Sequence, residues 1–226
     1  MAKLTWDGSG EKRFEMGVDQ GVLYKYDPTL NNGQGGYANG VAWNGLTSVS
    51  ASPEGGDAND LWADNMKYGS MRGAEKFGGT IEAYQAPDEF KECDGRATIT
   101  TGVTIGQQTR RSFGFCWRSK IGNDVDAEAG YIIHIAYGCT ASPSEQTYET
   151  MNDSPDAGTL SWEFEANAVS VTGHKGTALL EIDSTKFNTE ALKAKLKLIE
   201  DALYGTANAE PGILLPDEVK AIVEGH

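Results

Sequence analysis

Two segments of this sequence have the composition of ligand-binding loops, and each lacks residues that would complete the site. The glycines of Gly33–Gly36 could bring backbone amides close to a phosphate, but a phosphate loop follows a buried strand and opens a helix, and neither pattern flanks them. The carboxylates of Asp124–Glu128 are spaced like the start of a calcium loop, yet the sixth position is not glycine and the twelfth is Ile135 instead of glutamate. We interpret the first segment as a flexible loop and the second as the solvated tip of a hairpin.

The histidines and cysteines provide neither a metal ligand set nor an activated nucleophile. His134, His174 and His226 include no pair at i, i+4, and no Cys-x-x-Cys motif is present. A Gly-x-Ser-x-Gly nucleophile elbow is missing, and the many acidic residues could include a glycosidase-like pair, but their number says nothing about their placement. The sequence therefore predicts no catalytic residue, no metal and no cofactor. We expect His134 to be a packed or rim residue of a strand, and we expect three buried free thiols, at Cys93, Cys116 and Cys139.

Three tryptophans offer another kind of site, a platform on which sugar rings could stack. The candidates are Trp6, Trp43 and Trp62, and they make a carbohydrate-binding β-sandwich module the alternative function. Such a module is expected to accompany a secretion signal or a catalytic domain, and neither is found in these 226 residues. Burial in a core or in a subunit interface is the commoner fate of tryptophan.

Composition places the chain among globular proteins with an acidic surface. Hydrophobic residues make up 39% and charged residues 23%, and 19 basic against 33 acidic residues give a net charge of −14. So negative a chain is not expected to attract phosphates or anionic lipids broadly. No apolar stretch approaches the roughly 20 residues that span a bilayer, and Met1–Asp7 holds no apolar signal core. We therefore expect a soluble protein made in the cytoplasm.

Apolar and polar residues alternate along four segments after Glu75, which is the pattern of half-buried β-strands. Glycine is abundant, with 28 residues, and together with Asn and Asp it supplies the turns between these segments. Several such strands predict a mainly β fold, an antiparallel β-sandwich or barrel. The apolar rows are Phe113, Phe115 and Trp117; Tyr131, Ile133, Ile135 and Tyr137; Leu160, Trp162 and Phe164; and Ala178, Leu180 and Ile182.

One amphipathic α-helix is predicted to flank this sheet, at about residues 189–203. Asn188 is a good N-cap, and Gly205 ends the helix. Residues 1–206 are therefore predicted to form one β-sandwich domain, and 207–226 a C-terminal extension in which Pro216 could open a second short helix. The apolar stripe of the first helix consists of Leu192, Leu196, Ile199 and Leu203.

The first half of the chain is rich in turn signals. Pro28–Val41 has no apolar periodicity and is predicted to be a long Gly-rich loop, and loops of more than about 12 residues are usually functional or mobile. Asp57 could cap a short helix through Leu61, Trp62 and Met66. Pro87–Phe90 predicts one helical turn entered through proline.

A series of short motifs runs in order through most of residues 14–219. In this order they resemble the major tail protein, the tail tube subunit, of long noncontractile-tailed phages of Gram-positive hosts. The motifs are Gly40–Thr47, Ser52–Asp57, Leu61–Asn65, Thr80–Tyr84, Pro87–Phe90, Cys93–Gly95, Gly106–Arg110, Phe113–Gly114, Tyr137–Cys139, Ala141–Glu145, Asn152–Pro155, Ile182–Thr185 and Leu215–Glu218. An ordered series is far more specific than any one of its members, and none of them is a catalytic signature.

The resemblance implies a structural virion protein, without catalysis or a cofactor, that polymerises as stacked hexameric rings. It implies a tail-tube-type β-sandwich with a flanking helix and long loops that reach neighbouring subunits. Viral DNA would pass through the lumen without specific binding, and the tape-measure, tail-tip and tail-terminator proteins would be partners. The protein would lie in the virion tail, after assembly in the host cytoplasm and without contact with a membrane.

Two groups of residues are the candidates for these roles. The loop residues Asn32, Gly33, Gln34, Gly35 and Gly36 are the inter-subunit candidates, because the glycines leave the loop without a packed face of its own. The lumen-facing candidates are Glu163, Glu165, Glu181 and Asp183, which alternate with apolar strand residues and must therefore face water. An acidic lining would repel the phosphates of passing DNA.

Overall fold

The computed structural model describes residues 4, 6–56, 58–147, 150 and 157–225. The strands are β1 (Phe14–Asp27), β2 (Gly36–Tyr37), β3 (Val41–Trp43), β4 (Leu46–Ala51), β5 (Glu54–Gly55), β6 (Ala58–Ala63), β7 (Met66–Arg72), β8 (Glu75–Ala83), β9 (Ala97–Thr100), β10 (Val103–Ile105), β11 (Phe113–Gly122), β12 (Gly130–Ala141), β13 (Leu160–Ala166), β14 (Val169–Val171), β15 (His174–Thr177) and β16 (Leu179–Asp183). The helices are α1 (Leu30–Gly33), α2 (Phe90–Cys93), the 3-10 turn η1 (Ser184–Lys186), α3 (Glu190–Tyr204) and α4 (Pro216–Glu224).

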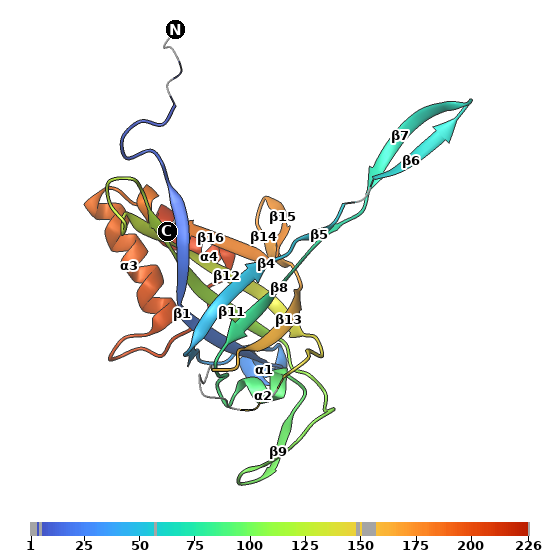
Figure 1. Ribbon diagram of the computed structural model, residues 1–226, viewed down its shortest axis with the longest axis vertical. Coiled ribbons are helices and arrows are strands. Elements are labelled where there is room, and N and C mark those ends of the chain that lie inside the picture. The colour runs from blue at the N-terminus through green and yellow to red at the C-terminus, as the bar shows by residue number, and fades with distance from the viewer. Residues whose placement is uncertain (1–3, 5, 57, 148–149, 151–156, 226) are drawn as a thin grey trace.

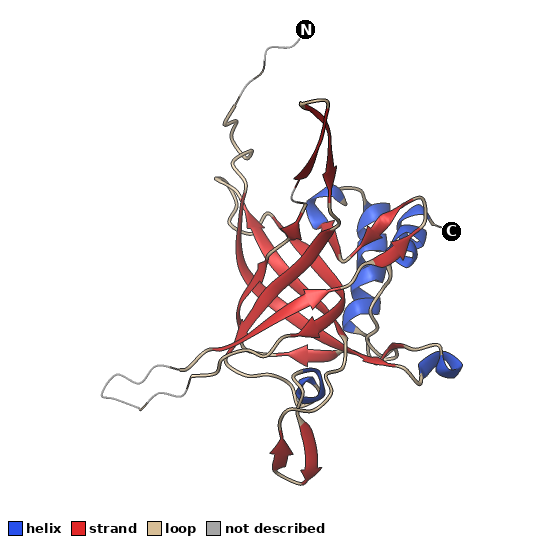
Figure 2. Ribbon diagram, turned by 90° about the vertical axis from the view of Figure 1, so that its right-hand side faces the viewer, coloured by secondary structure: helices blue, strands red, loops and turns tan. Residues whose placement is uncertain are grey.

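The main sheet follows the order β2-β1-β11-β12-β13-β8-β4, with every pair antiparallel. Along one edge, β12 pairs first with β16 and then with β13. Between these two partners Gly138 has a φ of 56°, and a Cβ there would lie 3.0 Å from the carbonyl oxygen of Asn167, so glycine permits this change of partner. The sheet curls until β4 lies beside β1 (Figures 1 and 2). The predicted mainly β, antiparallel fold is therefore confirmed.

The first hydrophobic core fills the inside of the curled sheet. The rings of Trp43, Phe90 and Trp162 pack in pairs with centroids 4.6 to 5.5 Å apart. Phe113 and Phe115 of β11 complete this aromatic cluster inside the curled sheet. Buried aromatic pairs with such tilted geometry stabilise the fold by about 0.5–1.5 kcal/mol each beyond their burial. The predicted sharing of one face by Phe113, Phe115 and Trp117 is confirmed.

A second core lies on the other face of β11 and β12, under α3 and α4. Cys116 and Ile133 from the sheet pack there with Ile199 and Leu203 of α3. The two layers are also joined by polar contacts, since the hydroxyl of Tyr24 donates to the carbonyl oxygen of Leu203 at 2.6 Å. β11 and β12 are thus buried on both faces. Alternate side chains along these strands point into the first core and into the second core, instead of into a core and into solvent. The predicted helix flanking the sheet is confirmed.

The ends of the helices follow their capping residues. Helix α3 begins one residue later than predicted, because Thr189 rather than Asn188 is the N-cap and its hydroxyl accepts from the amide of Leu192 at 3.3 Å. Gly205 ends it with a φ of 78°, as predicted. Helix α4 opens at Pro216, also as predicted. Among the described residues, no helix is long and apolar enough to cross a membrane.

The predicted short helix through Leu61, Trp62 and Met66 is wrong. These residues lie in the β6–β7 hairpin, which projects far from the body of the molecule (Figure 1). Its turn is formed by Asp64 and Asn65, whose φ angles are 49° and 63°. Asn and Asp tolerate this left-handed conformation, which is the one that two-residue hairpin turns require. A helix here would have had no apolar surface to pack against, whereas the hairpin satisfies its backbone groups by itself.

The predicted loop Pro28–Val41 contains two short elements, α1 and β2. Asn31 and Asn32 have φ angles of 53° and 58°, so α1 is a tight turn rather than a regular helix. The side chain of Asn31 donates to the carbonyl oxygen of Gly35 at 3.0 Å and closes this turn. The glycine-rich sequence is therefore used for a compact turn at the side of the body (Figure 2).

Candidate functional site

An acid-rich face covers the outer side of β4, β8 and β13. Thr80 of β8 lies between Ser50 of β4 and Glu163 of β13 in the strand register. Because side chains alternate along strands, this row points away from the core into which Trp162 and Phe164 are buried. We call the residues of this face with Ser or Thr hydroxyls and carboxylates the acid-rich face: Ser48, Ser50, Thr80, Glu82, Ser161, Glu163 and Glu165.

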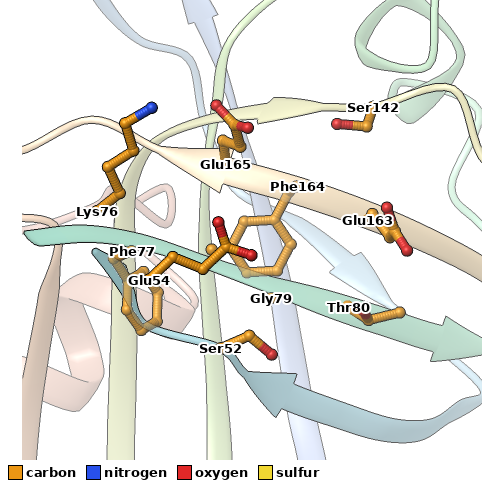
Figure 3. Close-up of a pocket in the computed structure, with 11 residues that line it drawn as sticks. Ser52, Glu54, Lys76, Phe77, Gly79, Thr80, Ser142, Glu163, Phe164 and Glu165 are labelled. Carbon is orange, nitrogen blue, oxygen red and sulfur yellow. The ribbon is translucent and has the colours of Figure 1, made fainter. Parts of the chain in front are cut away.

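Beside this face lies a cavity of about 220 Å³ to which Glu54, Lys76, Glu163 and Glu165 contribute (Figure 3). Lys76 is the basic residue of its lining, against three carboxylates. Glu163 and Glu165 are exposed. Carboxylates and hydroxyls in this arrangement hold water and repel phosphates, and offer a passing polyanion little to bind.

The structure places the other two lumen candidates on β16, away from this face. Glu181 shares its side of the strand with Leu179, which packs on the first core. Asp183 accepts from the backbone amide of Thr185 at 2.9 Å, and its Oδ2 lies 3.5 Å from Arg13 Nη2. Glu163 and Glu165 are therefore together, whereas Glu181 and Asp183 form separate local contacts.

His134 forms a polar row across three strands with Ser119 and Glu181. Its Nε2 lies 2.9 Å from Ser119 Oγ and its Nδ1 lies 3.1 Å from Glu181 Oε1, while its ring stacks on Trp117 with centroids 5.0 Å apart. Serine, histidine and carboxylate in this order could transfer a proton. However, Ser119 Oγ also lies 3.3 Å from Glu15 Oε2, and a carboxylate there would oppose the negative charge of an acyl-transfer intermediate. The row is best explained as cross-strand packing, as predicted for a packed histidine.

Burial of His134 predicts that the protein loses stability in mild acid. Burial lowers the pKa of His134, although Glu181 acts in the opposite direction. Because the folded pKa is below the unfolded value of about 6.5, the unfolded chain binds the proton first, and stability falls as the pH drops from about 7 to 5.

We expect His134→Phe, which keeps a ring on Trp117, to flatten this pH dependence of stability. Urea unfolding midpoints across this range measure it, and an equally steep curve for the variant would show that another group titrates. His174, which is exposed, provides the matched His174→Phe control, and its substitution is expected to leave the slope unchanged.

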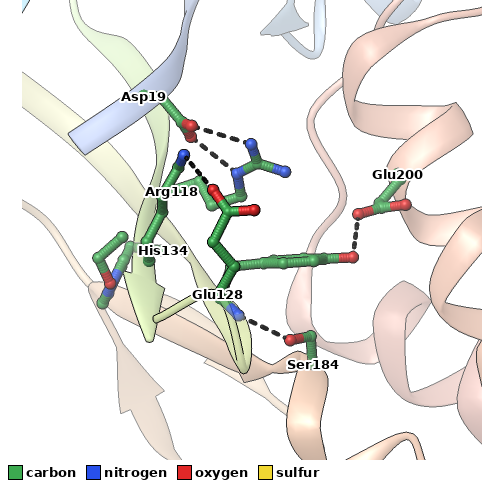
Figure 4. Close-up of polar contacts among 9 residues, drawn as sticks. Asp19, Arg118, Glu128, His134, Ser184 and Glu200 are labelled. Atoms are coloured by element: carbon green, nitrogen blue, oxygen red, sulfur yellow. Dashed lines mark hydrogen bonds and ion pairs between the residues drawn. The ribbon is translucent and has the colours of Figure 1, made fainter. Parts of the chain in front are cut away.

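A polar network connects three neighbouring strands, β1, β11 and β12, to α3 (Figure 4). Arg118 donates from Nε and Nη2 to the two carboxylate oxygens of Asp19 at 2.7 and 2.9 Å. These hydrogen bonds hold the pKa of Asp19 below its ordinary value. The guanidinium also lies 4.8 Å from the ring centre of Tyr131, whose hydroxyl donates to Glu200 at 2.6 Å. The network therefore joins β1, β11, β12 and α3 at the edge of the second core.

The inter-subunit loop candidates lie around α1, at the side of the molecule. A cavity of about 590 Å³ separates this turn from β1 and is lined by Leu23, Leu30, Asn31 and Tyr37, among others. Gly35 packs against the ring of Tyr26 with a φ of 82°, so that a side chain could not be placed there. The turn therefore contacts the body at Gly35, whereas Gly33 has no neighbour within 4 Å of the position that a Cβ would take.

The β6–β7 hairpin, which the sequence prediction missed, exposes large side chains to solvent. Tyr68 is 81% exposed, and Trp62 and Met66 are each 69% exposed. None of the hairpin residues belongs to either core. Monomeric proteins rarely keep so many large apolar groups together in water, and such patches mark interaction sites. The hairpin is therefore a candidate arm for binding another protein chain.

A second projecting hairpin, β9–β10, is also apolar and lies outside both cores. Ile99 is 63% exposed, Val103 45% and Ile105 40%. The Thr100–Val103 pair closes its turn, in which Gly102 has a φ of 77°. Residues 97–109 contain no charged side chain.

The profile described as "Phage tail tube protein" matches residues 1–202. The chain belongs to this phage tail tube protein family. No curated protein sequence matches this tail tube protein. Among solved structures, a chain described as "Cryo-EM structure of the anti-feeding prophage (AFP) baseplate, 6-fold symmetrised" matches with 6% identity and a TM-score of 0.37, over 79% of this chain and 97% of that chain. A TM-score at this level does not establish a shared fold.

In this tail tube protein the three tryptophans do not form one sugar-binding platform. Trp43 is only 3% exposed and donates from its indole nitrogen to the carbonyl oxygen of Gln85 at 2.9 Å. Trp62 lies on the β6–β7 hairpin and Trp6 in the N-terminal segment, which project from different parts of the molecule (Figure 1). The arrangement on which the alternative function depended is therefore missing from the described residues.

The cysteines of the tail tube protein are buried free thiols, as predicted. Burial raises the pKa of Cys93 to about 12, and that of Cys116 to about 12, so both stay protonated at neutral pH. Among the described residues, no group of three or more His, Cys, Asp or Glu side chains could hold a metal ion.

Proposed function

We propose that this tail tube protein assembles into hexameric rings that stack into a tube, and that viral DNA passes through the lumen of this tube. The observation that carries the proposal is the acid-rich face, because three adjacent strands present hydroxyls and carboxylates there, with Lys76 as the basic residue at its border. A DNA channel needs such a surface, since basic residues would bind the phosphates and slow the passage. Membership of the tail tube family supports the structural role. The proposal of six subunits per ring is based on the resemblance to major tail proteins.

The physical basis of the assembly is a contact between two different surfaces of identical subunits. Such a contact closes into a ring when its rotation allows, and rings that stack through a further contact form an open filament. The β6–β7 hairpin and the turn around α1 are the candidate contact elements, and the tape-measure, tail-tip and tail-terminator proteins are the further partners that the resemblance implies. Assembly would take place in the host cytoplasm and the finished protein would lie in the virion tail, as a structural component without catalysis.

Electron microscopy and ultracentrifugation of the wild-type protein test the proposal. We expect six-fold rings or tubes with a central hole in negative stain, and a concentration-dependent increase of the sedimentation coefficient. Seeding with purified tail tips provides a nucleus if the free chain polymerises slowly. A strictly monomeric protein at millimolar concentration, without rings or tubes even after seeding, would refute the proposal.

Deletion of Asn32–Gly36 tests the role of the turn around α1. We expect a folded monomer that polymerises poorly, by about tenfold or more in the amount of tube, because the deleted residues lie outside both cores while a lost contact of only about 1.4 kcal/mol weakens association tenfold. Sedimentation measures assembly and circular dichroism measures folding. Gln34→Ala is the control for a minor change in the same turn. Normal polymerisation of the deletion variant would remove this turn from the interface.

A further inference from the structure

The two exposed hairpins project from opposite ends of the molecule. In both views the β6–β7 hairpin lies near the top and the β9–β10 hairpin at the bottom of the long axis, with the curled sheet between them (Figures 1 and 2). Neither hairpin packs on either core. Because of this separation, the two hairpins of one copy cannot touch each other, but the hairpins of two copies aligned head to tail could.

The β9–β10 hairpin has an apolar face that nothing in its own chain covers. Val103 and Ile105 are two residues apart in β10 and therefore share a face. Thr98 and Thr104 are paired on the opposite face. A two-stranded hairpin is marginally stable in water by itself, and exposed β-branched residues without neighbouring charges invite pairing with another chain.

The β6–β7 hairpin carries a matching apolar face. The pairs Asn59–Met71, Leu61–Gly69 and Ala63–Met66 follow one another at intervals of two residues along β6, so their side chains lie on one side. On this side Leu61 is 40%, Met71 62% and Met66 69% exposed. We call this set the methionine face. Methionine side chains adapt to irregular apolar surfaces, and rigid β-branched residues are suitable partners for them.

We infer that the apolar face of the β9–β10 hairpin binds the methionine face of the β6–β7 hairpin in a second copy of this chain. This inference rests on the proposed function, because a tube repeats one subunit along its axis. The placement of the two hairpins at opposite ends of the molecule favours a second copy of this chain as the binding partner. A contact between two different ends of identical molecules can repeat from one molecule to the next and so build a filament along one direction. A nucleic acid is disfavoured because residues 97–109 include no basic side chain. The contact would join one ring to the next, while the contacts within a ring lie elsewhere.

Charge placed on the apolar face tests this inference. We expect Val103→Asp combined with Ile105→Asp to leave rings intact and to reduce the amount of tube by roughly tenfold or more, because two carboxylates would be desolvated in each contact. Thr98→Asp combined with Thr104→Asp is the matched control on the other face of the same hairpin, and is expected to form tubes normally. Circular dichroism and thermal melts check that both proteins are folded.

Disulfide trapping tests the pairing directly. Subunits carrying Met71→Cys and differently tagged subunits carrying Val103→Cys are mixed, assembled and oxidised; the three native cysteines are fully buried. We expect cross-linked dimers that contain both tags, and few dimers of either subunit alone.

The outcomes separate this inference from the proposed function. Tubes of normal yield from the Val103→Asp, Ile105→Asp protein, or tubes from the mixed cysteine subunits that give no mixed-tag dimer, would overturn the hairpin contact and leave the tube proposal standing. If wild-type protein forms neither rings nor tubes, the proposed function fails, and the hairpin contact fails with it.

Discussion

Replacing Glu163 and Glu165 with lysine is expected to stall DNA passage while tubes still form. The two carboxylates stand on the acid-rich face beside Glu54, and the double substitution changes the charge of each subunit by four units. At physiological salt the Debye length is about 8 Å, so lysines within that distance of the phosphates would hold them. Each phosphate contact adds to the salt dependence of binding, and the six subunits of the proposed ring would multiply the effect.

Phage particles that carry the double variant provide the measurement. DNA release triggered in vitro is expected to slow by at least about tenfold at low salt and to recover as the salt concentration rises. Glu210→Lys combined with Glu224→Lys makes the same change of charge at exposed positions away from the acid-rich face, and is expected to release DNA normally. Normal release by the Glu163→Lys, Glu165→Lys particles at low salt would show that this face does not line the channel.

Truncation of Phe90 is expected to destabilise the protein more than any surface substitution. Phe90 is 1% exposed, and its ring lies 4.6 Å from that of Trp43 and 5.5 Å from that of Trp162. Phe90→Ala would leave a cavity in the middle of the first core and is expected to lower the free energy of unfolding by about 3–5 kcal/mol. Such a loss is a large part of the stability of an ordinary domain.

Urea unfolding followed by tryptophan fluorescence measures this loss. Phe14→Ala is the control, because Phe14 is 48% exposed and its truncation is expected to cost about 0.5 kcal/mol or little more. Phe90→Leu, which keeps most of the volume, is expected to fall between the two. A loss below about 1 kcal/mol for Phe90→Ala would mean that α2 does not anchor the core.

Strand periodicity and helix capping were enough to predict most of the body of the fold. The alternating row Phe113, Phe115 and Trp117 lies on one core, and Gly205 ends α3. Both signals are local, because alternation follows from the backbone of a strand and glycine at a helix end follows from its freedom at positive φ. The motifs along residues 14–219 pointed to the tail tube family for a different reason, since sequence similarity reports shared ancestry.

Local propensity led to a wrong prediction where the sequence suits two structures about equally well and contacts decide between them. Asp57 and the residues after it suited a helix about as well as a hairpin, and the deciding feature is the turn at Asp64 and Asn65, which both adopt positive φ. That dipeptide was the one signal in the sequence that could have predicted the β6–β7 hairpin. Asn188 and Thr189 are both good N-caps, and only the packing of α3 on the sheet selects between them.

The grouping of the carboxylates and the placement of the hairpins depend on the tertiary structure alone. Periodicity shows that Glu163 and Glu165 share one face of their strand, as Glu181 and Asp183 do of theirs, but it does not show which other strands lie beside these faces. The pairing of β13 with β8 brings Glu163 and Glu165 to the face that holds Glu82, whereas the pairing of β16 with β12 places Glu181 beside His134. In the same way, the positions of β6–β7 and β9–β10 at opposite ends follow from how the sheet closes, because long-range pairing between strands fixes directions that no local pattern contains.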